Sequence, residues 1–99
     1  MQQEETTDAV FTESNGLAIA NAYPNPTQGK LNVSLNSDEE GQVSVALFDL
    51  TGRKIIEQNW FAYVGSNAIE LSLDALPSGS YVLVVKGSKG SDTRIIQKD

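Results

Sequence analysis

The chain is built from short runs in which apolar and polar residues alternate. Alternation over about four to eight residues is typical of a half-buried β-strand. It is clearest over residues 30–36, with Leu31, Val33 and Leu35 on one face, and over residues 42–48. Weaker patterns predict further strands at residues 17–23, 53–59, 67–73 and 92–98.

The strand predicted at residues 81–86 is apolar on both faces. Its odd-numbered residues, from Tyr81 to Val85, would point to one side of a sheet, and Val82 and Val84 to the other. Such a strand belongs in the middle of a packed structure rather than at its rim. Seven short strands at this spacing indicate an all-β domain, and burying their apolar faces requires two sheets packed as a sandwich.

The connections between these strands carry strong turn signals. Pro24, Asn25 and Pro26 fix the backbone twice and remove two N–H donors, so the chain must leave the sheet there. Residues 49–52, Asp-Leu-Thr-Gly, predict a tight hairpin. The aromatic stretch 60–66 predicts a crossing between the sheets, and the loop before Gly79 predicts that Leu76 plugs one end of the core.

Composition excludes several kinds of chemistry. The chain of 99 residues holds one domain, and it has neither cysteine nor histidine. Disulfides, thiolate sites and Ser-His triads are therefore excluded, and the sequence predicts no enzyme and no cofactor. Lysine and arginine are too few to predict nucleic-acid binding. No apolar run is long enough to span a membrane or to resemble a secretory signal, so any export signal would lie upstream in a longer parent.

The formal charge of −6 is unevenly distributed along the chain. Residues 1–16 hold four acidic residues and no basic one, without periodicity, and Val10–Phe11 is their only apolar pair. This composition predicts a flexible acidic linker over residues 1–16, with a short segment that could adhere to the domain formed by residues 17–99.

Three clusters each allow a functional and a structural interpretation. Asp38, Glu39 and Glu40 could bind Ca²⁺, but the looped Asp-x-Asp-x-Asp-Gly pattern is absent, which favours a solvated turn. Trp60, Phe61 and Tyr63 could stack on sugars. In an extended segment the last two share a face and Trp60 points away, so the alternative is a tryptophan at the core edge and a half-exposed tyrosine.

The third cluster is basic and belongs to the last predicted hairpin. It consists of Lys86, Lys89, Arg94 and Lys98. A charged edge strand that discourages aggregation is the structural interpretation, and a docking surface is the functional one.

Three stretches of the sequence resemble one known family, the type A C-terminal sorting domains of the type IX secretion system of Bacteroidota. The residues that carry the resemblance are Pro24, Asn25, Pro26 and Gly29, then Asp49, Gly52 and Arg53, then Leu76, Gly79 and Tyr81. The resemblance covers about residues 20–99. Its terminal basic residue corresponds to Lys98, although Asp99 follows here.

The resemblance implies a fold and a function. Members of the family are similar to immunoglobulin domains, so the expected fold is a seven-stranded immunoglobulin-like antiparallel β-sandwich. Its expected role is to direct an N-terminal passenger protein from the periplasm, through the outer-membrane translocon and its shuttle proteins, to the medium or the cell surface. A sortase-like protease would cleave within residues 1–21.

Within this interpretation the turn motifs are expected to hold the fold, and the last hairpin is expected to dock on the translocon through its edge and its basic residues. Replacing Arg94 and Lys98 with alanine is then expected to leave melting nearly unchanged and to trap the passenger in the periplasm. The alternatives are an accessory fibronectin-like or carbohydrate-binding module of an extracellular enzyme, and a structural spacer or weakly self-associating module.

Overall fold

The computed structural model describes residues 16–88 and 90–99. These residues form an all-β sandwich of seven strands and include no helix that could cross a membrane. The strands are β2 (Leu17–Tyr23), β3 (Lys30–Ser37), β4 (Gly41–Asp49), β5 (Lys54–Ala62), β6 (Gly65–Ser72), β7 (Gly79–Gly87) and β8 (Gly90–Lys98). All strand pairs within the sheets are antiparallel, which confirms the predicted immunoglobulin-like architecture.

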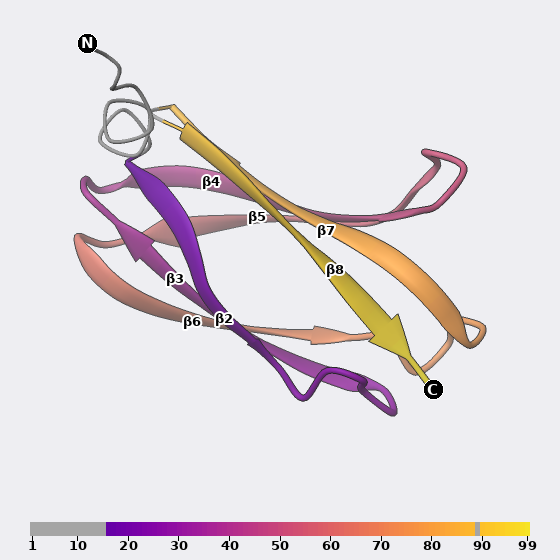
Figure 1. The fold of residues 1–99 in the computed structure, drawn as a ribbon. Helices are drawn as coiled ribbons and strands as arrows, with labels where there is room; N and C mark the ends of the chain where they lie inside the picture. Colours follow the sequence, from indigo (N-terminus) through magenta and orange to yellow (C-terminus); the bar gives the residue numbers. More distant parts are fainter. Residues whose placement is uncertain (1–15, 89) are drawn as a thin grey trace, which may run out of the picture.

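Two sheets face each other across the core (Figure 1). One has the strand order β2-β3-β6 and the other β5-β4-β7-β8. The alternating residues of each strand supply the side chains between them, as the period of two requires. The largest fully buried side chains are Leu31, Leu35, Leu47, Leu71, Leu73, Leu83 and Ile96.

The strand predicted at residues 81–86 lies in the middle of the structure, as expected. β7 lies between β4 and β8, and Leu83 and Val85 are fully buried in the core. Val82 and Val84 lie on the opposite, outer face of this sheet and are half-buried.

The aromatic stretch differs from its prediction. Trp60 pairs with Val43 and the buried Ala62 pairs with Gly41, so β5 runs three residues further than the pattern suggested. Aromatic residues suit a pleated strand, and the ladder with β4 continues until the chain crosses to the other sheet at residues 63–64. The last strand also begins two residues earlier than predicted, at Gly90.

Side chains of β8 close the edge of the sandwich between β2 and β8. Asp92 Oδ2 accepts a hydrogen bond from the backbone N–H of Ile19 at 2.9 Å, and Arg94 Nη2 donates to the Ile19 carbonyl. A register shift in the β2–β3 ladder occurs just after Ile19. The backbone N–H and C=O of Ile19, on the edge strand β2, are thereby hydrogen-bonded within the molecule.

Candidate functional site at the distal end of the sandwich

The three motif segments lie at one end of the sandwich, which we call the distal end. It is formed by residues 24–29, 49–53, 73–81 and 98–99, where β2, β4, β6 and β8 finish. The chain enters β2 at the opposite, proximal end, as Figure 1 shows. Segments far apart in the sequence therefore lie at the same end. Hydrogen bonds join residues 24–29, 73–81 and 98–99 there, while the 49–53 hairpin lies apart from the first of them (Figure 1).

The Pro-Asn-Pro segment lies along the free edge of β8. The Asn25 side chain imitates a strand residue, since its Oδ1 accepts from Gln97 N at 2.9 Å and its Nδ2 donates to Ile95 O at 3.0 Å. Cis peptide bonds precede Pro24 and Pro26. The two prolines have no N–H of their own to satisfy, so the segment can occupy an edge without leaving donors unpaired.

Thr27 continues this pairing and is fully buried, with 0% of its surface exposed. Its N–H donates to Gln97 O, and its carbonyl accepts from Asp99 N, both at 2.8 Å. Its hydroxyl donates to Lys30 O at 2.6 Å and accepts from Gly29 N at 3.1 Å. All of its polar groups are thus satisfied in the interior, as burial demands. The sequence interpretation missed Thr27, and its only signal is a donor-bearing residue directly after two prolines.

Gly29 lies where two chain segments meet. Its carbonyl accepts from Leu73 N at 2.6 Å, and a Cβ at this position would collide with the Asp74 carboxylate. Only glycine fits this close approach without displacing Asp74. The first motif segment is therefore locked to the loop that precedes the third.

The third motif segment closes the distal end of the core. Leu76 is half-buried against the core, which confirms its predicted position. The hydroxyl of Tyr81 donates to Pro77 O at 2.6 Å and fixes the loop before β7. Lys98 Nζ donates to Leu76 O at 2.8 Å, so the last strand and this loop are joined.

The second motif segment is a self-contained hairpin at the same end. Asp49 Oδ1 accepts from Thr51 N, Thr51 Oγ1 and Arg53 N at 2.6–3.0 Å. These hydrogen bonds, first of all the one from the Thr51 hydroxyl, lower the pKa of Asp49 to about 2. Gly52 has φ +92°, a conformation that favours glycine. The Asp49 carboxylate therefore forms the turn and stays ionised, whereas a general acid must carry a proton.

A hollow at the distal end is the best candidate for a binding surface. Its volume is about 470 Å³, and it is lined by Pro24, Pro26, Thr27, Gln28, Gly29, Lys30, Asn32 and Asp99. The rings of two exposed prolines give it apolar walls, and polar and charged groups of both signs surround them. Such a surface can bind a protein segment.

The four basic residues of the last hairpin do not share one face. Arg94 and Lys98 point toward the interior side of β8, where both donate to backbone carbonyls, and Lys98 is only 9% exposed. Lys86 is exposed on the opposite face, and Lys89 lies outside the described residues. These hydrogen bonds argue against the expectation that Arg94 and Lys98 can be removed with melting nearly unchanged, because each holds a backbone carbonyl that would lose its partner.

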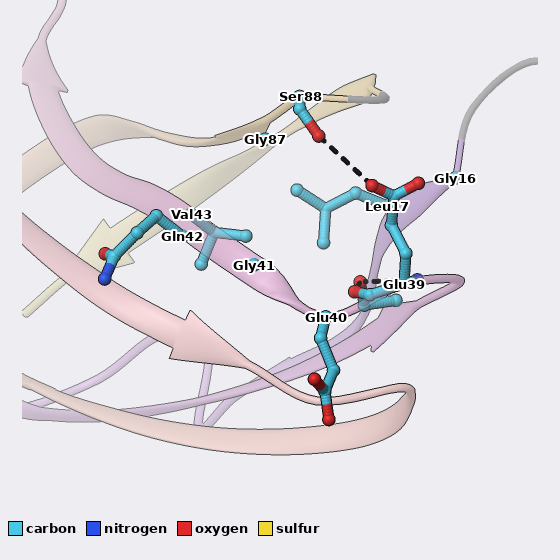
Figure 2. A pocket seen from close by; sticks show the side chains of 10 residues that line it. Gly16, Leu17, Glu39, Glu40, Gly41, Gln42, Val43, Gly87 and Ser88 are labelled. Atoms are coloured by element: carbon cyan, nitrogen blue, oxygen red, sulfur yellow. Dashed lines mark hydrogen bonds between the residues drawn. The ribbon is translucent and has the colours of Figure 1, made fainter.

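The acidic turn and the small hollow beside it lie at the proximal end (Figure 2). Glu39 Oε1 accepts from Ser88 Oγ at 3.3 Å, whereas the Glu40 side chain points away from that pair. The hollow has a volume of about 20 Å³, which suits a single water molecule. In residues 16–88 and 90–99, no three acidic side chains are grouped as metal ligands.

Trp60 and Phe61 lie on opposite faces of β5, as the alternation predicts, and Tyr63 directly follows the strand. Phe61 and Tyr63 meet edge to face, with ring centroids 5.1 Å apart and planes at 72°. Trp60 faces inward beside Val43 and is 37% exposed at the sandwich edge. A sugar stacks on the flat face of a ring, and two nearly perpendicular rings offer no continuous platform for it.

Comparisons with solved structures support the fold. Two crystal structures of the β-glucosidase from Kluyveromyces marxianus, one selenomethionine-labelled and one in complex with glucose, have TM-scores of 0.56 and 0.58. Each is 16% identical, and the likeness covers 84% of this chain but only 14% of the enzyme. At this identity it concerns the fold alone. No curated protein matches the sequence significantly.

A comparison with family models addresses the motif segments directly. The model described as "Secretion system C-terminal sorting domain" matches residues 21–98. This range begins just before the Pro-Asn-Pro segment, contains all three motifs and ends at the buried Lys98. The chain therefore belongs to the secretion system C-terminal sorting domain family.

Proposed function

We propose that this domain is a type A sorting signal that directs an N-terminal passenger across the outer membrane of a member of the Bacteroidota through the type IX system. Its action is recognition and not catalysis. The observation that carries this proposal is the placement of the three family motifs at the distal end, where hydrogen bonds join the first and the third. A passenger joined before residue 17 would lie at the proximal end and would leave the distal end free for a partner.

The recognised surface is the distal hollow together with the exposed parts of the Asp49–Arg53 hairpin. A translocon that accepts unrelated passengers needs an epitope that does not depend on them. The hydrogen bonds of Asn25, Thr27 and Lys98 tie this epitope to β8 and give it one shape. Preorganisation of this kind lowers the entropic cost of binding for the translocon and its shuttle proteins.

The basic residues then divide into two groups. Arg94 and Lys98 act on recognition indirectly, by holding β2 and the loop before β7 in place. The exposed Lys86, with Lys89, remains a candidate for direct docking. A sortase-like protease would cleave in residues 1–21, before the three motif segments, so the passenger is released or attached at the surface after export.

Fusion of the chain to a periplasmic reporter in a type IX-competent host tests the proposal. Full export of the reporter, lost in a translocon-deficient strain, is the expected result. The same fusion carrying Gly29→Val, whose Cβ meets the Asp74 carboxylate, is the second variant, and its export should fall if that contact fixes the distal end. A reporter that stays in the periplasm with the intact domain, while a proven sorting domain exports it, would contradict the proposal.

A further inference from the structure

The outer face of the four-stranded sheet carries a second hollow, which we call the outer hollow. Its volume is about 420 Å³, and it is lined by Ser44, Ala46, Phe48, Lys54, Glu57, Val84 and Lys86. Its floor is apolar: Ala46 on β4 lies directly opposite Val84 on β7, and Phe48 lies opposite Val82.

This apolar floor is unusual for its position. A sheet with one face on the core normally turns a polar face to water. The two central strands, β4 and β7, depart from this pattern, because Ala46, Phe48, Val82 and Val84 lie on the outer face. Within residues 16–88 and 90–99 no strand of the other sheet lies on this face, and Val82 and Val84 stay half-buried there, whereas neighbouring side chains already cover Ala46, which is 5% exposed.

The charged groups that face the outer hollow are Lys54, Glu57 and Lys86. Lys54 pairs with Glu57 at 3.1 Å and lies over the Phe48 ring, and this pairing lowers the pKa of Glu57. No carboxylate of the described residues lies within ion-pair distance of Lys86. The hollow therefore holds one uncompensated positive charge at its proximal end and suits an apolar segment that carries a carboxylate.

We propose that the chain's own segment Asp8–Glu13 docks in the outer hollow. Val10 and Phe11 cover the apolar floor, and Glu13 pairs with Lys86. Residues 1–15 hold four acidic side chains and no basic one, and Val10–Phe11 is their only apolar pair. Charge and hydrophobicity thus both match the hollow.

The length of the chain fits this placement. Gly16 lies beside Gly87 and Ser88, where β7 ends, and Lys86 directly precedes them. Phe11 is five residues before Gly16, so an extended chain reaches about 17 Å, which exceeds the roughly 10 Å between Gly87 and Val84 along β7. The short tether gives an effective concentration in the millimolar range, so even weak contacts hold the segment.

This inference does not rest on the sorting role, although the docked segment would cover Lys86 until residues 1–21 are cleaved, and its test needs no export assay. A nitroxide is placed on the full chain through Thr7→Cys, which is the sole cysteine because the sequence has none. The methyl signals of Ala46 and Ala68 are compared by NMR. Ala68 is exposed on the outer face of the other sheet, and the ratio of the two signals in the chain carrying Val10→Ser and Phe11→Ser is the reference for a segment that does not dock.

Docking predicts strong broadening of Ala46 and Val84 and little of Ala68. The substitution Lys86→Glu, or the double substitution Val10→Ser and Phe11→Ser, should remove most of the broadening at Ala46 and Val84. Lys30→Glu, a charge reversal on the other sheet, leaves it unchanged. Equal broadening of Ala46 and Ala68 overturns the proposal. Broadening that passes from a labelled chain to an unlabelled one in a mixture also overturns it and assigns the hollow to a second copy.

Discussion

The buried hydroxyl of Thr27 is the clearest single-residue test of the distal end. Thr27→Val keeps the shape of the side chain but leaves Gly29 N and Lys30 O without their partner. Unsatisfied buried groups cost about 1–3 kcal/mol each, so a loss of about 2 kcal/mol in the free energy of unfolding is expected. Urea denaturation measures it. Thr27→Ser keeps the hydroxyl and should retain most of the stability, and equal losses in both variants would assign the effect to packing.

Lys98 tests whether a basic residue at this position holds the fold. Lys98→Met keeps the apolar stem and removes the ammonium group, so the Leu76 carbonyl loses a charged donor at 2.8 Å. Hydrogen bonds to charged groups contribute about 1.5–3 kcal/mol, and we expect a loss of stability near the lower end of that range. Thermal melting checks it. Lys30→Met, at a lysine with 71% of its side chain exposed, is the control and should melt within a degree or two of the parent.

Asp49 predicts how the hairpin responds to acid. Its pKa is about 2 in the folded protein against an ordinary value of 3.8, so the folded state favours the ionised form. The stabilisation is therefore present above about pH 4 and is lost as the pH falls toward 2. The melting temperature of Asp49→Asn should lie below that of the parent at pH 7, and the gap should shrink between pH 4 and 2. A gap that does not change over this range would show that the carboxylate charge is irrelevant.

At the scale of the element, the first motif segment protects the free edge of β8. Asn25→Leu leaves Ile95 O and Gln97 N unpaired beside an isoleucine that is 58% exposed. Bare backbone next to apolar surface is a template for strand pairing between molecules. We expect faster hydrogen exchange at Gln97 and concentration-dependent dimerisation by sedimentation velocity. Asn36→Leu, at an exposed position on β3, is the matched control and should remain as monomeric as the parent.

The strands could be predicted because their cause is local. Alternation in β3 and β4 and the doubly apolar β7 fix which side chains are buried, and the structure confirms all three. The motif segments could be located for the same reason, since proline, glycine and Asp49 act on their own backbone.

The interactions between segments could not be predicted, because nothing local specifies them. Asn25 and Gln97 are 72 residues apart in the sequence, and Arg94 and Ile19 are 75 apart. The positions of basic residues on a hairpin do not indicate which other segments of the chain contact them. The sequence therefore could not indicate that Lys98 is buried, because its burial depends on the loop at Leu76, 22 residues away.

At the scale of the whole molecule, different tasks are expected at the two ends of the sandwich. The proximal end receives the chain through Gly16, whose carbonyl accepts from Asp38 N. The distal end gathers the family motifs around the distal hollow. If the machinery reads the distal end, identical changes at the two ends must have unequal effects on export.

Two exposed glutamines allow this comparison. Gln28 lines the distal hollow, and Gln42 lies near the start of β4 at the proximal end. Gln28→Trp adds bulk that fills the hollow, so export of a fused reporter should fall several-fold, while Gln42→Trp should export normally. Neither side chain is buried, so both variants should melt close to the parent, and this is measured first. Equal export by the two variants, with melting unchanged, would move the recognised surface away from the distal hollow and toward the exposed hairpin at Asp49–Arg53 or the sheet face that carries Lys86.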